Sequence, residues 1–390
     1  MSIFRKTLSC AVLAALGTCA LVGCGRQDTS NEATTSASPE ASAAITETIS
    51  ESTASSEQTS SSEASGAQPA ETEPAVSEAP SVDDSTPFGQ LGALHVENGK
   101  LTAADGNIVQ LYGMSTHGIA WFPQYINYDS FRTLRDDWNT NCIRLAMYTA
   151  EYGGYCAGGD KEQLKQLVRD GVSYATELGM YVIVDWHILS DCDPNQNKDE
   201  AIAFFREMSE TFADNDNVLY EICNEPNSGT SWDSIKSYAE EVIPVIREQK
   251  PDAVILVGTP TWSQEIDKAA ASPLTFDNVM YTLHFYAGTH KDDLRNRLET
   301  CAQNNLPVFV SEFGMCDASG NGANDFDSTT KWLDLLNKYQ ISFCCWNLAN
   351  KDESSSVFKA ASTTLSDWTD EDFNESGRWI RDYFRKMPQK

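Results

Sequence analysis

Two glutamates lie at the ends of apolar runs of the sequence, where an ionised side chain is costly to bury. Glu225 ends the run at 220–226, and Glu312 lies near the end of the run at 307–314. A carboxylate in such a position must be paired, hydrogen-bonded or open to a cleft. Arg144, at the end of another apolar run, could form a structural ion pair with either glutamate. Because two carboxylates compete for this one arginine, we favour two carboxylates that face a cleft.

Two facing carboxylates suit the hydrolysis of a glycosidic bond, in which one protonates the leaving oxygen and the other attacks or activates water. Sugar rings bind to flat apolar walls, because the C–H face of a pyranose stacks on an aromatic ring. The aromatic residues that could form such walls are Trp121, Tyr148, Trp262, Tyr286 and Trp346. Any one of them could instead pack in the core.

Histidines follow the same pattern, since four of the five lie at or just beyond the ends of apolar runs: His117, His187, His284 and His290. A cluster of histidines would also suit a metal-dependent hydrolase. However, the sequence contains no H-x-H or H-E-x-x-H spacing, and the ligands would come singly from three strands. We therefore expect neither a metal nor another cofactor.

Short apolar runs that alternate with longer amphipathic segments position these residues. The runs that we expect to be strands are 109–114, 142–147, 181–185, 218–223, 254–257, 279–283, 308–310 and 341–345. Between them, apolar residues recur every three or four positions, which is typical of helices. Eight Val/Ile-rich strands, each followed by a helix, predict an α/β fold, a parallel (β/α)8 TIM barrel. The carboxyl ends of its strands meet on one face, where the chemistry gathers.

A small β-hairpin is expected before the barrel, at 94–109, because Asn98-Gly99 and Asp105-Gly106 are turn sequences. An open, doubly wound sheet is the competing fold. It is less favoured because no glycine-rich phosphate loop follows the first strand.

The chain of 390 residues carries a formal net charge of −29, with a sequence pI of about 4.4. Such a charge repels polyanions, so we expect no nucleic-acid partner and no anionic lipid surface bound through a basic patch. An uncharged substrate is favoured over an anionic one.

The first 86 residues differ in composition from the rest. Residues 1–23 have the pattern of a signal peptide, with basic residues before an uncharged apolar stretch. They end in Leu-Val-Gly before Cys24, which resembles the lipobox of bacterial lipoproteins, so Cys24 is the expected lipid attachment site; secretion after simple cleavage is the alternative. Residues 24–86 contain no aromatic residue, which predicts a disordered linker rich in Ser, Thr and Glu. Residues 87–390 should form one exported, monomeric domain.

Eight cysteines lie in the predicted domain, and no C-x-x-C pair suggests a zinc site. Cys156, Cys192 and Cys316 fall in predicted loops. A disulfide among these three could form in an exported protein.

The sequence from Leu91 to about Phe384 resembles glycoside hydrolase family 5, and in particular its bacterial endoglucanase (cellulase) branch. The similar segments are GMSTHG at 113–118, RLAMY at 144–148, DWHIL at 185–189, YEICNEPN at 220–227, YTLHFYAGTH at 281–290, VSEFG at 310–314, WNL at 346–348 and KDE at 351–353. The resemblance implies a retaining mechanism through a glycosyl-enzyme, with Glu225 as the general acid/base and Glu312 as the nucleophile.

The resemblance also implies roles for the surrounding residues. Arg144 and the Tyr286 hydroxyl would keep Glu312 ionised, Asn224 would bind the sugar 2-hydroxyl, and His187 and His284 would orient the two carboxylates. Trp346 would lie beneath the attacked sugar, joined to Asn347 by a cis peptide. The implied sugar contacts are His117, Trp121, Tyr148, Lys351 and Glu353 on the glycone side, and Trp262 and His290 on the aglycone side.

The implied substrate is cellulose or a related β-1,4-glucan, which the KDE segment at 351–353 favours. Related barrels cut mannan, mixed-linkage β-glucan or xyloglucan with the same catalytic residues, so these substrates are alternatives. A lipid-anchored sugar-binding protein without turnover is the alternative from another class, because aromatic clefts serve capture as well as cleavage. The presence of both Glu225 and Glu312 counts against it.

Overall fold

The computed structural model describes residues 83–388 of the chain. The expected signal peptide, the lipidation site Cys24 and nearly all of the expected linker lie outside the described residues, so these expectations stay predictions. Over residues 83–388, no helix combines the length and the apolar character needed to cross a bilayer.

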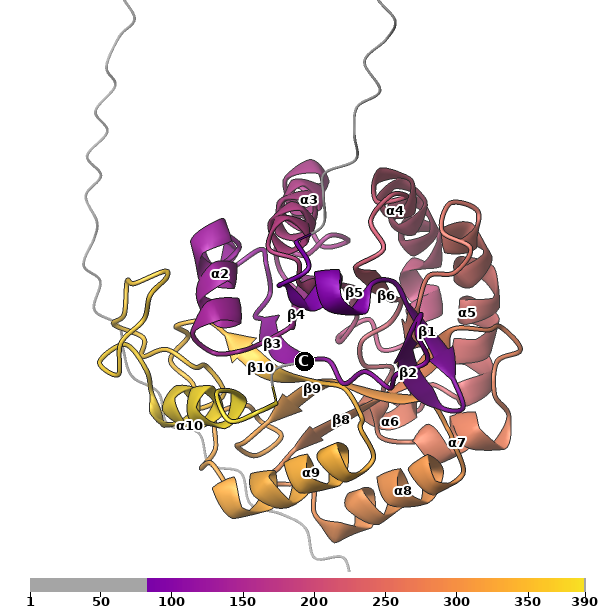
Figure 1. The fold of residues 1–390 in the computed structure, drawn as a ribbon. Helices are drawn as coiled ribbons and strands as arrows, with labels where there is room; N and C mark the ends of the chain where they lie inside the picture. The colour runs from indigo at the N-terminus through magenta and orange to yellow at the C-terminus, as the bar shows by residue number, and fades with distance from the viewer. Residues whose placement is uncertain (1–82, 389–390) are drawn as a thin grey trace, which may run out of the picture. The chain divides into compact units, whose positions relative to one another are not determined.

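Eight parallel strands close into the predicted barrel, in the order β10-β3-β4-β5-β6-β7-β8-β9 (Figure 1). The strands are β3 (Tyr112–Thr116), β4 (Cys142–Tyr148), β5 (Tyr181–His187), β6 (Val218–Glu221), β7 (Ile255–Val257), β8 (Val279–Tyr286), β9 (Val308–Gly314) and β10 (Phe343–Leu348). The prediction placed the start of the first strand at Val109, which is three residues too early. Val109 instead donates a backbone hydrogen bond to Leu101 in the preceding hairpin.

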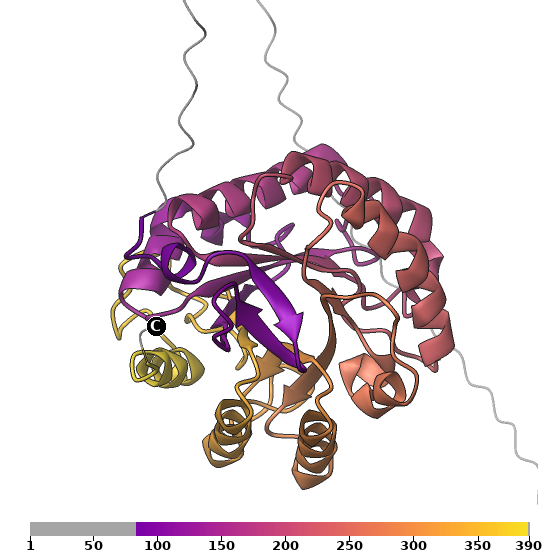
Figure 2. The ribbon, with the colours of Figure 1, turned by 45° about the vertical axis from the view of Figure 1, so that its right-hand side comes forward.

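Helices pack around the outside of the barrel (Figure 2). They are α2 (Tyr128–Asp136), α3 (Lys161–Glu177), α4 (Lys198–Thr211), α5 (Trp232–Arg247), α6 (Pro260–Ser263), α7 (Ile266–Ala271), α8 (Asp292–Gln303), α9 (Phe326–Lys338) and α10 (Glu375–Phe384), with short helices α1 (Pro87–Leu91), η1 (Pro123–Tyr125) and η2 (Pro194–Asn197). Helix α3 illustrates why they form. The Asp160 side chain accepts two backbone N–H groups of its first turn, and Leu164, Val168 and Val172 bury one face against the barrel.

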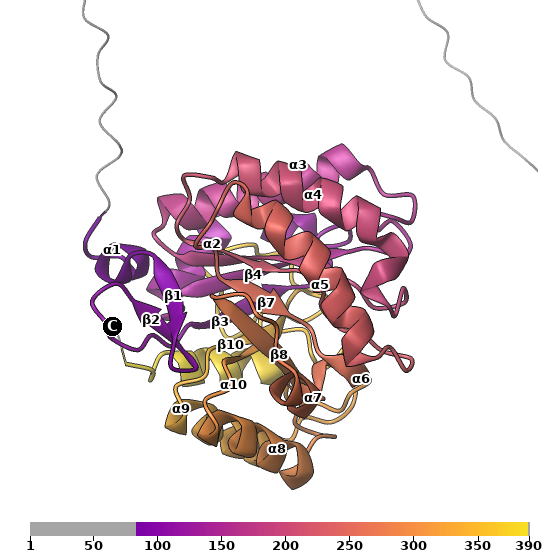
Figure 3. The ribbon, with the colours of Figure 1, turned by 90° about the vertical axis from the view of Figure 1, so that its right-hand side faces the viewer.

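The predicted hairpin is present and lies at one end of the barrel, beside α1 (Figure 3). Its strands, β1 (Leu94–Glu97) and β2 (Lys100–Ala103), are antiparallel. Asn98 and Gly99 have φ angles of 50° and 74°, as a two-residue hairpin turn requires. Leu94 and Leu101 pack against residues at the starts of the barrel strands, such as Tyr181. The hairpin therefore closes the amino end of the barrel, so a substrate can enter only at the carboxyl end.

Side chains that point into the barrel form layers of different polarity. Tyr181 and Ile183 of β5 belong to the apolar layer at the amino end. Because side chains alternate along a strand, Asp185 and His187 continue the same inward face. Arg144, Asp185 and Glu221 form a buried charged layer above the apolar one, linked by ion pairs. The inward-facing residues of the strands are therefore apolar at the amino end of the barrel and charged toward its open carboxyl end.

Strand β9 departs from this alternation next to the candidate site. Its register against β8 shifts between the pairs of Thr282 and His284. Its register against β10 also shifts, between the pairs of Phe343 and Cys345. An extra residue in one strand re-aims side chains locally. As a result the consecutive residues Ser311 and Glu312 both reach groups inside the barrel.

Candidate active site

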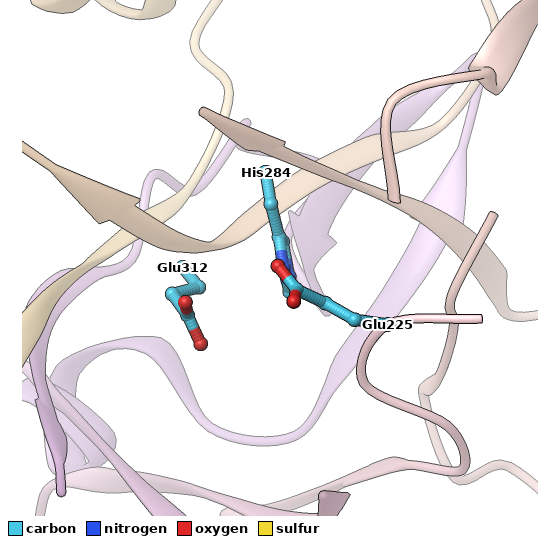
Figure 4. Close-up of side chains that lie close together, drawn as sticks. All are labelled: Glu225, His284 and Glu312. Carbon is cyan, nitrogen blue, oxygen red and sulfur yellow. The ribbon is translucent and has the colours of Figure 1, made fainter. Parts of the chain in front are cut away.

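Glu225 and Glu312 lie close together at the carboxyl end of the barrel. Glu225 follows β6, and Glu312 lies within β9. One oxygen of each carboxylate and one ring nitrogen of His284 all lie within 4.8 Å of one another. Figure 4 shows the His284 ring against the Glu225 carboxylate, with the Glu312 carboxylate beside them. The two carboxylates that the sequence singled out therefore form a pair.

Glu312 is held by two hydrogen-bond donors. An Nη1 of Arg144 donates to its Oε2 at 3.1 Å, and the Tyr286 hydroxyl donates to its Oε1 at 2.8 Å. Burial and the nearby charge of Glu312 raise the pKa of Tyr286, so the phenol keeps its proton and remains a donor. The sequence analysis expected Arg144 and Tyr286 beside Glu312, and both donate hydrogen bonds to its carboxylate.

Glu225 has a different partner. Its Oε1 lies 2.9 Å from Nδ1 of His284, and its side chain is 11% exposed. Burial lowers the pKa of His284, but the nearby carboxylates of Glu221, Glu225 and Glu312 outweigh this effect and raise the pKa to about 9. Glu225 therefore contacts a titratable group, whereas Glu312 contacts a permanent cation and a phenol.

Arg144 is fully buried beneath the pair and binds more groups than the sequence indicated. It forms ion pairs with Glu221 at 2.7 Å, Asp185 at 3.0 Å and Glu312 at 3.1 Å. It also donates to the side-chain oxygen of Asn224 at 2.7 Å. The sequence analysis did not assign Asp185 or Glu221 to the site, although each lies on the inward face of a strand that ends there.

Asn224 is fixed by groups on several sides. Its Nδ2 donates to the carbonyl of Ile188 at 3.0 Å and lies 3.2 Å from Nε2 of His187. The other ring nitrogen of His187 lies 2.6 Å from Asp185. Burial, together with the charge of Arg144, lowers the pKa of His187 to about 3, so the ring is neutral. The expectation that both histidines orient the carboxylates fits His284, whereas His187 contacts Asn224 instead.

A cleft of about 620 Å³ opens above these residues. It is lined by every predicted site residue within the described chain except Arg144 and Asn224, which lie beneath it: His117, Trp121, Tyr148, His187, Glu225, Trp262, His284, Tyr286, His290, Glu312, Trp346, Lys351 and Glu353. Glu151, Leu189, Gln264 and residues 318–320 also line it and were missed. These residues belong to loops, whose path over the cleft carries no periodic signal.

One side of the cleft is an aromatic wall. The ring centroids of Trp121 and Tyr148 are 4.7 Å apart, and those of His117 and Trp346 are 5.0 Å apart. The peptide bond between Trp346 and Asn347 is cis, as the resemblance implied. Rings in this arrangement present apolar surface to a ligand.

Two charged residues border this wall. Lys351 forms an ion pair of 2.6 Å with Glu353, and Glu353 lies 3.7 Å from His117. Burial lowers the pKa of His117 to about 3, so its ring is neutral. Ammonium and carboxylate groups here can bind ligand hydroxyls.

Trp262 and His290 lie elsewhere in the same cleft. Trp262 is 44% exposed and belongs to α6, in which Thr261, Trp262 and Ser263 all have left-handed backbone angles. The buried Ser263 hydroxyl holds this turn by donating to the carbonyl of Asn224 at 2.7 Å. Non-glycine residues in this conformation persist only where their surroundings enforce it, so the exposed indole is held in place.

Glu225, His284 and Glu312 are also the residues whose atoms could approach a common metal ion. These atoms are already engaged: His284 Nδ1 contacts Glu225, and both Glu312 oxygens accept hydrogen bonds. We therefore assign the three residues to a hydrogen-bonded pair of carboxylates and do not identify them as metal ligands.

The disulfide considered among the loop cysteines is not formed. Cys156 and Cys192 are half-buried, Cys316 is buried, and all eight cysteines of the described chain are free thiols. Each of the three loops has its own contacts; for example, Cys192 lies against Ser190 and Ser228.

The chain is similar to known proteins over the whole barrel. A family described as Cellulase (glycosyl hydrolase family 5) matches residues 102–352. Endoglucanase A of Butyrivibrio fibrisolvens is 50% identical over 299 residues, and an endoglucanase of Clostridium saccharobutylicum is 46% identical over 300 residues. Each alignment covers 76% of this chain, and they cover 69% and 65% of the two relatives.

Solved structures agree with the sequence relatives. A cellulase named Cel5C_n superposes with a TM-score of 0.76 at 42% identity, covering 78% of this chain and 95% of that chain. The catalytic domain of the Thermobifida fusca endoglucanase Cel5A, as a variant in complex with cellotetraose, superposes with a TM-score of 0.74 at 41% identity, covering 77% of this chain and all of that chain.

Proposed function

The chain belongs to glycosyl hydrolase family 5, and from this premise we propose that it is a retaining endo-β-1,4-glucanase that cuts internal bonds of cellulose and related soluble β-glucans. The observation that carries the proposal is the gap between the two carboxylates, whose nearest oxygens lie within 4.8 Å. Retaining glycosidases place these groups about 5–5.5 Å apart, whereas inverting enzymes leave about 6.5–9.5 Å for a water molecule.

The unequal surroundings of the two glutamates support unequal roles. Glu312, held by Arg144 and Tyr286, is the nucleophile that attacks the anomeric carbon. Glu225 is the general acid that gives a proton to the leaving oxygen as the glycosidic bond breaks. In the second step, Glu225 takes a proton from water while the water oxygen attacks the anomeric carbon and releases Glu312.

Groups around the pair position the sugar. Asn224 lies next to Glu225 in the sequence, and its amide, oriented by Arg144 and His187, binds the 2-hydroxyl of the attacked sugar. The Trp346 indole provides the apolar floor of the same subsite, and its ring stacks near that of His187. Hydrogen bonds to the 2-hydroxyl strengthen in the transition state, so Asn224 contributes to rate as well as to affinity.

The remaining contacts are assigned to the two sides of the scissile bond. His117, Trp121, Tyr148, Lys351 and Glu353 bind glycone sugars, and Trp262 and His290 bind aglycone sugars. Because sugar-binding residues continue on both sides of the catalytic pair, the chain of a polysaccharide can run through the cleft. This arrangement favours cleavage of internal bonds.

Measuring the rates of hydrolysis of different polysaccharides tests this proposal. The named relatives are endoglucanases, and the Thermobifida fusca protein binds cellotetraose. We expect the release of reducing ends, with a rapid fall in viscosity, from carboxymethylcellulose and mixed-linkage β-glucan, and equal rates with and without EDTA. Preference for mannan or xyloglucan would overturn the substrate assignment, and binding without any product would overturn the enzymatic one.

We also propose that the enzyme is a monomer held at the cell surface by a lipid on Cys24, with residues 24–86 as a spacer between membrane and barrel. The lipobox-like sequence before Cys24 supports the lipid anchor. Cys24→Ala should release active enzyme from the membrane fraction and abolish labelling by a fatty-acid analogue. Continued membrane association of this variant would contradict the proposal.

A further inference from the structure

Glu221 is a buried carboxylate that the mechanism above does not use. It lies on β6, four residues before Glu225, is completely buried and does not line the cleft. Its Oε2 accepts a hydrogen bond from Nε of Arg144 at 2.7 Å, and its Oε1 accepts one from the Ser311 hydroxyl at 2.6 Å. Burial alone would raise the pKa of Glu221, but the charge of Arg144, its hydrogen bond and the nearby His284 ring outweigh this effect and lower the pKa to about 2. Glu221 is therefore an ionised acceptor behind the catalytic pair.

The Ser311 hydroxyl connects Glu221 to His284. Its oxygen lies 2.9 Å from Nε2 of His284. A serine hydroxyl has a single hydrogen, and an ionised carboxylate can only accept. Ser311 must therefore spend its hydrogen on Glu221, and it can only accept a hydrogen bond from Nε2 of His284.

This order of donors fixes the tautomer of His284. Nε2 carries a hydrogen in every protonation state of the ring, so only Nδ1 can gain or lose a proton. Nδ1 is the nitrogen that lies 2.9 Å from Oε1 of Glu225 (Figure 4). A proton can then lie on either side of this contact, as a Glu225 carboxyl beside neutral His284 or as a Glu225 carboxylate beside an imidazolium.

We propose that Glu221 and Ser311 are positioning residues that make Glu225 and His284 a single proton-holding pair for acid/base catalysis. The pair gives one proton to the leaving oxygen in the first step and regains one from water in the second. The negative charge of Glu221, whose Oε1 lies 3.7 Å from Nε2 of His284, favours the protonated pair. This inference rests on the proposed glucanase function and adds a third carboxylate to its machinery.

Other charged groups also face His284, and they are the same in the variants below. Glu312 on β9 acts on it through its charge, Asp185 on β5, whose pKa burial raises well above its usual range, also lies nearby, and Arg144 on β4 binds the far side of Glu221. A change of the same direction in the Glu221 variant and in the Ser311 variant therefore reports the connection through Ser311.

The pH profile of kcat/KM on an aryl cellobioside tests the proposal. Its alkaline limb reports loss of the essential acid of the free enzyme. Glu221→Gln removes a charge that favours the protonated pair, so the alkaline limb should move to lower pH by about one unit, which is about a tenfold loss on the alkaline side. Ser311→Ala should move the limb in the same direction, and Ser311→Thr, which restores a hydroxyl, should return it.

Ser115→Ala is the matched control. Ser115 is also a buried hydroxyl of the polar layer, and it contacts Arg144 at 3.2 Å but not His284. Its alkaline limb should stay in place. Equal losses at every pH in Glu221→Gln and Ser311→Ala, with the limb unmoved, would mean a merely structural role and overturn the proposal.

A measurement on the wild-type protein tests the proposal even if the Glu221 and Ser311 variants fail to fold. With 15N-labelled histidine, the five histidines give few signals, and those of His284 are identified by their loss in His284→Asn. We expect Nε2 to stay protonated throughout a pH titration while Nδ1 changes. A neutral ring with its proton on Nδ1 would overturn the proposed order of donors. Absence of any hydrolysis by the wild-type protein would instead refute the glucanase function, independently of this tautomer.

Discussion

Tyr286→Phe removes one hydrogen bond from the nucleophile and little else. The Tyr286 hydroxyl donates to Oε1 of Glu312 at 2.8 Å, while the ring itself packs against Gly314 and stays in the variant. A hydrogen bond to a charged group is worth about 1.5–3 kcal/mol. Its loss disfavours ionised Glu312 by that amount, which corresponds to about one to two pH units.

The assay is the pH dependence of kcat/KM on an aryl cellobioside. Ionised Glu312 is required for attack, so the acidic limb should move to higher pH by about one to two units in Tyr286→Phe. Below the limb the variant should be slower by about 10–100-fold, and at higher pH the loss should be smaller. An acidic limb within about 0.3 pH units of that of the wild type would refute the role given to this contact.

Tyr238→Phe is the matched control for the loss of a buried hydroxyl. Tyr238 lies on α5, and its hydroxyl donates to the carbonyl of Ile222 at 2.7 Å, outside the cleft. Its removal should lower the free energy of unfolding by about 0.5–1.5 kcal/mol. Its acidic limb should match that of the wild type.

Three further outcomes are expected. Glu312→Gln should be inactive on every substrate. Glu225→Gln should still attack an aryl cellobioside, accumulate a glycosyl-enzyme visible by mass spectrometry, and recover turnover when azide is added. Recovery of turnover by azide in Glu312→Gln instead would mean that the two roles are exchanged. Trp262→Ala should raise KM for cellopentaose by about 3–10-fold through the loss of ring stacking worth about 1 kcal/mol, with a smaller change for an aryl cellobioside whose aglycone is short; equal changes would contradict an aglycone role. The pKa of Glu221 is lowered from 4.5 to about 2, so the stability that it contributes is present above pH 4.5 and is lost as the pH falls toward 2. The Tm measured by thermal unfolding should therefore fall less steeply between these pH values in Glu221→Gln than in the wild type. Parallel curves of Tm against pH for the two proteins would contradict the assignment.

The sequence predicted the barrel because short apolar runs alternate regularly with amphipathic helical segments along the whole domain. Each apolar run was long enough to be read as a strand, and the hairpin turn at Asn98-Gly99 carries its own signal. The first strand was placed too early because Val109 is apolar whether it pairs in the barrel or, as observed, with Leu101 of the hairpin. Hydrophobicity alone does not distinguish these partners.

The catalytic candidates were found because Glu225 and Glu312 interrupt apolar runs, but the groups beneath them were missed. Asp185 and Glu221 carried a usable signal, because Asp185 stands two residues before His187 and shares its inward face. Ser311 could not be placed in this way, since the register shift of β9 depends on its two neighbouring strands. The left-handed turn at 261–263 contains no glycine and is held by tertiary hydrogen bonds, so no local pattern predicts it.

The stereochemistry of hydrolysis tests the central claim most directly, because it depends on the separation and roles of the two carboxylates alone. Proton NMR spectra of a wild-type digest of cellopentaose, recorded before mutarotation, report the configuration of the first products. The short gap between Glu225 and Glu312 predicts that the β-anomer appears first and the α-anomer grows in later. An initial α-anomer would mean inversion and would contradict the assignment of Glu312 as the nucleophile.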